Sequence, residues 1–231
     1  MFEELIKIFS GNHPLTVAGE QFAKMLELVR GMIEKASGAY WGHHLTEEEQ
    51  RGIYETDVEV NRLQRAVRKQ IILHLSAPER TTDVPYGLLL MSLVKDAERL
   101  GDYAKNLLEV HELTQQGAGD LPDGELTKRL RDIASFVENL ARESSAVYSS
   151  ANKRRAQELA TEGKQVSAAC EALIKDVARS NLPSAVSVDM ALAARFYKRI
   201  AGHLLNLLSS VLMPLHKLDY LDEDEFPQSV R

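Results

Sequence analysis

Hydrophobic side chains recur at every third or fourth position along most of this chain of 231 residues, which is the spacing of one face of an α-helix. The pattern predicts six long helices, at residues 15–38, 47–76, 84–116, 125–149, 151–179 and 184–212. Short segments that contain Gly, Pro or Asn separate these stretches, as expected where a helix ends. Thr46 is predicted to begin the second helix, because Glu49 three residues later completes a capping box.

The third and sixth helices resemble one another when the sequence is shifted by one hundred positions. Arg99 then meets Arg199, and Asn106-Leu107-Leu108 meets Asn206-Leu207-Leu208, which is more than a shared helical period would give. An internal repeat fixes the architecture, so we expect an all-α fold of two tandem three-helix-bundle repeats, similar to spectrin repeats. The expected segments are a short N-terminal helix in residues 1–14, repeat 1 in 15–118, repeat 2 in 119–218 and an acidic C-terminal tail in 219–231.

The composition favours a cytoplasmic protein that does not bind nucleic acid. The formal net charge is −6, whereas nucleic-acid-binding proteins usually carry a basic surplus. The single cysteine, Cys170, cannot form an intramolecular disulfide, which fits a reducing compartment. The N-terminus lacks the features of a signal peptide, and no window offers about 18 uninterrupted apolar residues. We therefore expect contact with a membrane only through partner proteins.

The motifs of common enzymes are missing from the sequence. A di-iron or di-manganese bundle would need Glu-x-x-His on two helices, and none of the seven histidines has a Glu three positions before it. No phosphate-binding glycine loop and no GxSxG motif is present. Cys170 falls inside an apolar helical stripe, where a packed small side chain is expected rather than a nucleophile. We predict that the protein is not an enzyme.

Two acids on the third helix, Glu98 and Asp102, lie four residues apart, so they are neighbours on one face and repel each other. A helical wheel places them at the edge of the apolar stripe, where partly buried like charges need a counter-charge. Arg68 occupies the same flank of the second helix, and Lys105 lies on the same edge as the acids. The alternative is a solvated edge neutralised by nearby lysines and arginines.

Residues 98–106, ERLGDYAKN, resemble the ERIGDxAxN signature of the PhoU family of bacterial phosphate-uptake regulators. Upstream, residues 57–61, DVEVN, resemble the DxxVN stretch of that family's second helix. The resemblance covers roughly residues 15–216 and implies an all-α protein, commonly a homodimer, without enzymatic activity. It also implies an adaptor that contacts a phosphate transporter, a sensor histidine kinase or both. Several members of that family bind iron or zinc clusters through E/DxxxD motifs on the second and third helices of each repeat.

This sequence keeps one of the four carboxylate pairs that the resemblance implies, Glu98 and Asp102. The other three motif positions hold residues that do not form an acid pair. They are Gln64 with Arg68, Lys198 with Gly202, and either Cys170 with Ile174 or, one residue later, Glu171 with Lys175. Two carboxylates beside an arginine make a poor metal site. We therefore expect no cofactor, with Arg68 replacing the metal as the cation that neutralises the acids.

The alternative that stays open is a weak iron or zinc site at Glu98 and Asp102, completed by Asp57 or Asn61. The predicted function is a PhoU-like regulator of phosphate transport or phosphate signalling. Two other functions stay open: a metal-binding helical carboxylate protein, and a generic helical-bundle scaffold or chaperone. The partner, the docking surface and the sensed signal do not follow from the sequence.

Overall fold

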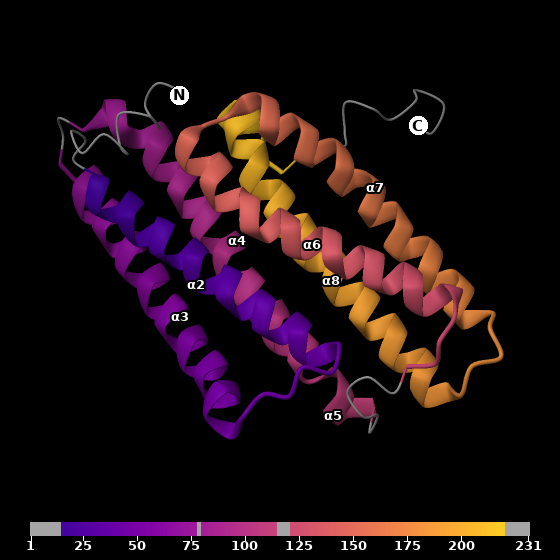
Figure 1. Ribbon diagram of the computed structural model, residues 1–231. Coiled ribbons are helices and arrows are strands. Elements are labelled where there is room, and N and C mark those ends of the chain that lie inside the picture. The colour runs from indigo at the N-terminus through magenta and orange to yellow at the C-terminus, as the bar shows by residue number, and fades with distance from the viewer. Residues whose placement is uncertain (1–14, 78–79, 115–120, 220–231) are drawn as a thin grey trace.

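The computed structural model describes residues 15–77, 80–114 and 121–219, and every regular element in these ranges is helical (Figure 1). The prediction of an all-α fold is therefore confirmed. The helices are α2 (Thr16–Tyr40), α3 (Glu47–Leu75), α4 (Val84–Leu108), α5 (Val110–Thr114), α6 (Glu125–Ser150), α7 (Lys153–Ala178) and α8 (Ser184–Leu212), with short 3₁₀ turns at Thr81–Asp83 and Leu215–Lys217.

Three predicted segments fall wholly or partly outside the described residues. They are the N-terminal helix in 1–14, the boundary between repeats at 118 and 119, and the tail beyond Asp219. Among the residues that are described, no helix has the length and apolar character needed to cross a membrane.

The start of α3 is fixed by the capping box that the sequence predicts. The hydroxyl of Thr46 accepts a hydrogen bond from the backbone N–H of Glu49 at 3.2 Å, and the Glu49 carboxylate accepts one from the backbone N–H of Thr46 at 2.8 Å. Two donors that no helical carbonyl can reach are satisfied in this way.

The predicted helix at 84–116 is two helices in the structure, because α4 ends at Leu108 and α5 begins at Val110. Val110 is fully buried, and the hydroxyl of Thr114 donates a hydrogen bond to Asp189 Oδ2 on α8 at 2.8 Å. These contacts hold α5 against α8. The hydrophobic spacing continues through Glu109, so periodicity alone predicts one continuous helix.

The helices form two layers. α3, α4, α8 and α7 lie side by side in that order, and α2 and α6 pack across them and against each other. In Figure 1, α2 and α6 lie in front of α4 and α8, with α3 and α7 at the two sides. Buried side chains from all six long helices form one continuous hydrophobic cluster. The two halves therefore share a core instead of burying two separate ones.

Pairs of equivalent positions show that α4 and α8 cross with approximate two-fold symmetry. Asp96 on α4 contacts His203 on α8, and Tyr103 on α4 contacts Phe196 on α8. Positions 96 and 196, and positions 103 and 203, are one hundred residues apart, so each contact is the counterpart of the other. The rings of Tyr103 and His203 stack on each other, with centroids 5.6 Å apart. The two segments that resemble each other in the sequence thus form α4 and α8, a symmetric pair of helices at the centre of the fold.

We predict that Leu100→Ala on α4 lowers the free energy of unfolding by about 3 kcal/mol, because it leaves a hole where the two halves meet. Leu100 is 1% exposed, whereas Leu88 on the same helix is 52% exposed. The matched variant Leu88→Ala should change the free energy of unfolding by less than about 0.5 kcal/mol.

Urea unfolding followed by helical circular dichroism and by the fluorescence of Trp41, the one tryptophan, measures both variants. The two signals should change together in one transition for the wild type and for Leu100→Ala, as a shared core requires. Two separated transitions in the wild type would contradict the shared core.

Candidate functional site

The acids of the candidate site lie on α3 and α4, two helices that pack against each other. Glu98 and Asp102 project from α4, and their side chains are 17% and 30% exposed. Asp57 and Asn61 face them from α3, and the Asn61 amide donates a hydrogen bond to Asp57 Oδ2 at 3.3 Å. A Cβ at Gly101 would lie 3.4 Å from Asp57 Oδ1, so the glycine lets this carboxylate approach α4 closely. Asp57, Asn61 and Asp102 lie close together in this way, whereas no hydrogen bond or ion pair in the described part of the chain joins Glu98 directly to the other three residues of the candidate metal site.

The cations that neutralise Glu98 and Asp102 come from their own helix. Lys95 lies 3.2 Å from Glu98, and Arg99 lies 3.1 Å from Asp102, each pair three residues apart on α4. Lys105 Nζ lies 2.7 Å from Asp57 Oδ2 and 3.5 Å from Asp102 Oδ1, so it bridges the two helices. Local lysines and arginines, the alternative that the sequence left open, therefore surround these acids.

Arg68 is not the counter-charge that the helical wheel predicted. It makes no ion pair with any acid in the described part of the chain, and its buried Nε has no hydrogen-bond partner there. One turn before it, the Gln64 amide donates to the carbonyl oxygen of Val94 on α4 at 3.2 Å. A helical wheel gives the direction in which a side chain leaves its helix. It does not show which residue of the neighbouring helix lies opposite that side chain along the helix axis.

Lys105 is the centre of the charge arrangement. Partial burial opposes its charge, but the hydrogen bond and negative charge of Asp57, together with Asp102, outweigh burial and raise the pKa of the Lys105 ammonium. Asp57 is 7% exposed, so its carboxylate has little water to stabilise it and depends on this cation.

The donor set does not fit an iron or zinc centre. The described residues contain no cluster of three or more His, Cys, Asp or Glu side chains that could hold a metal ion. The Lys105 ammonium stands between Asp57 and Asp102, in the position where a metal shared by these carboxylates would bind. Hard metal ions need several oxygen ligands at one point. Asp57 Oδ2, Glu98 Oε2 and both oxygens of Asp102 already pair with lysine or arginine, which leaves Asp57 Oδ1 as a buried oxygen without a hydrogen-bond partner in the described part of the chain.

The equivalent positions of the second half are no better suited to a metal. Cys170 is fully buried, and burial raises the pKa of its thiol to about 12, so it is neither a reactive nucleophile nor a ready thiolate ligand. Lys198 forms an ion pair with Glu171, and Gly202 offers no side chain. The core position that the sequence predicts for Cys170 is confirmed.

A buried polar network near the N-terminal half of α8 escaped the sequence analysis. Asp189 is fully buried and accepts hydrogen bonds from the hydroxyls of Tyr40, at 2.7 Å, and Thr114, at 2.8 Å. Burial, with the added negative charge of Asp189, raises the pKa of Tyr40, which therefore stays a neutral donor. The signal in the sequence was an acid inside an apolar run. The network links α2, α5 and α8 through buried hydrogen bonds.

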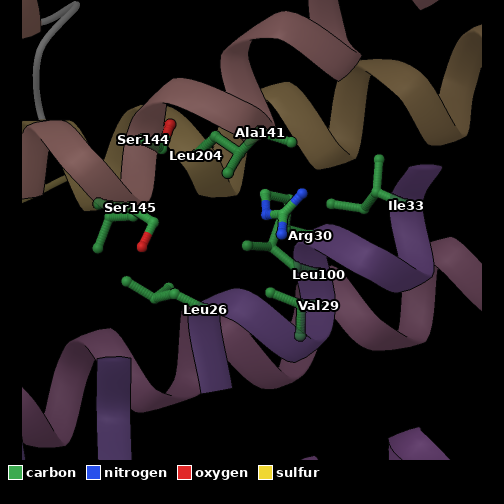
Figure 2. A pocket seen from close by; sticks show the side chains of 10 residues that line it. Leu26, Val29, Arg30, Ile33, Leu100, Ala141, Ser144, Ser145 and Leu204 are labelled. Atoms are coloured by element: carbon green, nitrogen blue, oxygen red, sulfur yellow. The ribbon is translucent and has the colours of Figure 1, made fainter. Parts of the chain in front are cut away.

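The small cavity at the centre of the molecule is also unsuited to a ligand. It lies between α2 and α6 above α4 and α8, and its volume of about 10 Å³ holds at most one water molecule. Figure 2 shows Arg30 extending from α2 beside Ala141 and Ser145 of α6. Arg30 pairs with Glu27 and Glu34 of its own helix, so its charge is already neutralised.

Known proteins are similar to part of this chain in sequence and to most of it in fold. Residues 22–110 match the family model of the PhoU domain, which covers most of α2 and the whole of α3 and α4. No match is found among curated protein sequences.

Two solved structures are similar to this chain. The crystal structure of PhoU from Pseudomonas aeruginosa has a TM-score of 0.75 at 19% identity, over 89% of this chain and 98% of that one. The phosphate transport system regulatory protein PhoU from Streptococcus pneumoniae has a TM-score of 0.69 at 17% identity, over 89% of this chain and 95% of that one. At these identities the likeness shows a shared fold, and it extends beyond the residues that the family model matches.

We predict that Lys105→Met lowers the free energy of unfolding by about 2 kcal/mol, because Asp57 loses its charged hydrogen-bond partner while staying buried. The control Lys95→Met breaks a more exposed pair and should cost less than about 0.5 kcal/mol. Adding Asp57→Asn to Lys105→Met should recover part of the loss.

The pH dependence separates charge from packing in this experiment. The folded pKa of Lys105 lies above the unfolded value of about 10.4, so its contribution is fully present below that pH and is lost as the pH rises through the folded pKa. The difference between wild type and Lys105→Met should therefore stay constant from pH 7 to about pH 10 and shrink above it. A difference that falls between pH 7 and pH 9 would contradict this assignment.

We also predict that tag-free protein incubated with Fe²⁺ or Zn²⁺ and then desalted retains no stoichiometric metal, because Lys105 occupies the shared position between the carboxylates. Elemental analysis by mass spectrometry measures this directly. Any residual metal should be the same in the Asp57→Asn/Asp102→Asn variant. One equivalent that disappears in this variant would establish the metal site instead.

Proposed function

We propose that the protein is a regulator of phosphate transport that acts by binding, because residues 22–110 match the family model of the PhoU domain. The observation that carries the proposal is the match of this domain, which includes both motifs singled out in the sequence, residues 57–61 and 98–106. The similar structure from Streptococcus pneumoniae is that of a phosphate transport system regulatory protein.

The chemistry of the candidate site supports binding as the mode of action. Its carboxylates are neutralised by lysine and arginine side chains of the same chain, and this arrangement stabilises the α3–α4 pair. A general acid or base needs a proton that can be exchanged with a bound substrate, and an activated nucleophile needs an adjacent base. Asp57, Glu98 and Asp102 instead form fixed ion pairs.

In this proposal the protein works in the cytoplasm as an adaptor that docks on a phosphate transporter, on a sensor histidine kinase or on both. Docking shifts the conformational equilibrium of the partner only if the adaptor binds one of its states more tightly than the other. A homodimer would present two such docking surfaces. The two packed layers of helices would make the docking surface largely preformed.

Uptake of radiolabelled phosphate by cells of the source organism tests the proposal. Deleting the gene should leave uptake high in phosphate-rich medium, where the parent strain represses it, and the wild-type gene supplied in trans should restore repression. The Lys95→Met variant should restore it equally well, because this exposed pair contributes little to the fold. Uptake that responds normally to phosphate in the deletion strain would contradict the proposal.

A further inference from the structure

A basic groove runs between α7 and α8 on the opposite half of the molecule from the acidic site. Its volume is about 400 Å³, and it is lined by Ser167, Arg195, Lys198, Arg199, Gly202, His203 and Asn206. Four of these seven side chains are basic and none is acidic. Such a concentration of positive charge is unexpected in a chain whose formal net charge is −6.

The groove is the counterpart of the acidic site in the internal repeat. Shifting by one hundred positions places Lys198 over Glu98 and Gly202 over Asp102, while Arg199 lies over Arg99. The acids of the first half are thus replaced by a cation and by a residue without a side chain. A Cβ built on Gly202 would meet no atom within 4 Å, so space is open at this point. Equivalent places in the two halves therefore differ: the first half holds a filled acidic site, and the second half holds an open basic groove.

The charges of the groove are only partly neutralised. Lys198 pairs with Glu171, and His203 Nδ1 lies 2.8 Å from Asp96 Oδ1. Arg195 and Arg199 are exposed, lie one turn apart on α8, and form no ion pair with a carboxylate of the described residues. Two guanidinium groups at this spacing can each bind a carboxylate through two hydrogen bonds.

The acidic segment of this chain begins beside the groove. The backbone N–H of Asp219 donates a hydrogen bond to the hydroxyl of Ser209 at 3.3 Å, and Ser209 lies one turn beyond Asn206, where the groove ends. Leu218 is 7% exposed, so the chain is anchored at this point. Burial and the charge of Asp96 raise the pKa of Asp219, and His203 of the groove opposes them, so Asp219 is within electrostatic range of the groove.

The residues beyond Asp219 are opposite in charge to the groove, and the distance that they can span is similar to the length of the groove. Residues 222–225 read DEDE, four consecutive acids that start three positions after Asp219. Extended chain spans at most about 3.3–3.6 Å per residue, so these acids can lie about 10–20 Å from Asp219. From Asn206 to Arg195 the groove follows eleven residues of helix, or about 16 Å.

We propose that this groove binds the carboxylates of residues 222–225 of the same chain, with Arg195 and Arg199 as their principal partners. The acidic segment then covers the surface that distinguishes the second half from the first. An anchor only three residues away keeps its effective concentration high, so weak individual ion pairs suffice for binding.

Paramagnetic relaxation in the full chain tests the proposal. Phe226→Cys places a thiol directly after the acids, and the native Cys170 is buried with its pKa raised to about 12, so a nitroxide label should react with the new thiol alone. The label should broaden the amide signals of Ser167 and Gly202. The equivalent amides of the first half, Asn61 and Asp102, should stay sharp.

Charge reversal provides the control for this measurement. Arg195→Glu/Arg199→Glu should abolish the broadening, and so should 1 M salt, where screening acts over about 3 Å. The matched variant Arg62→Glu/Arg65→Glu reverses two exposed arginines on α3 and should leave the broadening unchanged. Broadening that is absent in the wild type, or that survives reversal of Arg195 and Arg199, would overturn the proposal.

A mixing experiment separates binding within one chain from exchange between two copies. Isotope-labelled protein without nitroxide is mixed with unlabelled protein that carries it. No broadening is expected in the mixture if each segment binds its own chain. Broadening at Ser167 and Gly202 in the mixture would overturn the assignment and identify a second copy as the source of the acids.

Discussion

The pairing of α4 with α8 is the constraint on which the rest of the structure depends. These two helices lie at the centre of a layer of four, cross with approximate two-fold symmetry and each carry more buried residues than any other helix of the same half. Their contacts include the buried carboxylate of Asp96, which accepts hydrogen bonds from His203 and Asn206. In the described part of the chain, the hydrogen-bond partners of this buried acid both belong to the opposite half, so it fixes the register of the pair, because a shift by one turn would remove them.

This symmetry explains why two sites of opposite charge occur at equivalent places. In the first half, Asp57 and the acids of α4 are neutralised by Lys105 and by neighbours on the same helix. In the second half, the position equivalent to Lys105 is Leu205, which packs against Gly163 of α7. An apolar contact thus holds α7 to α8 where an ion pair holds α3 to α4. On this side of α8, Lys198 and His203 pair with Glu171 and Asp96, while Arg195 and Arg199 form no ion pair within the described residues.

The sequence predicts most of the helices because local signals specify them. The capping box at Thr46 and the apolar stripes depend only on neighbouring residues, and the repeat of α4 in α8 is visible as matched side chains. The four-residue spacing of Glu98 and Asp102 also locates the candidate site. Even the prediction that Lys105 shares the edge of these acids agrees with the contacts observed.

The errors arise where the outcome depends on how helices pack. The separation of α4 from α5 at Glu109 goes with contacts of α5 with α8. The partner of Asp57 depends on how far α3 is shifted along its axis relative to α4. Arg68 lies on the expected flank yet pairs with neither acid, because local cations on α4 are closer. Asp189 could be recognised only as an acid in an apolar helix, since its donors come from distant segments.

Native-state hydrogen exchange tests most directly whether the α4–α8 pair makes the two halves one cooperative unit. The slowest amides of α4 and α8 should report the same opening free energy, equal to that of global unfolding measured by denaturant. Both should fall by the same amount in a variant destabilised at the contact between them. Amides of α6, α7 and α8 that open together at a clearly lower free energy than those of α2, α3 and α4 would contradict the account.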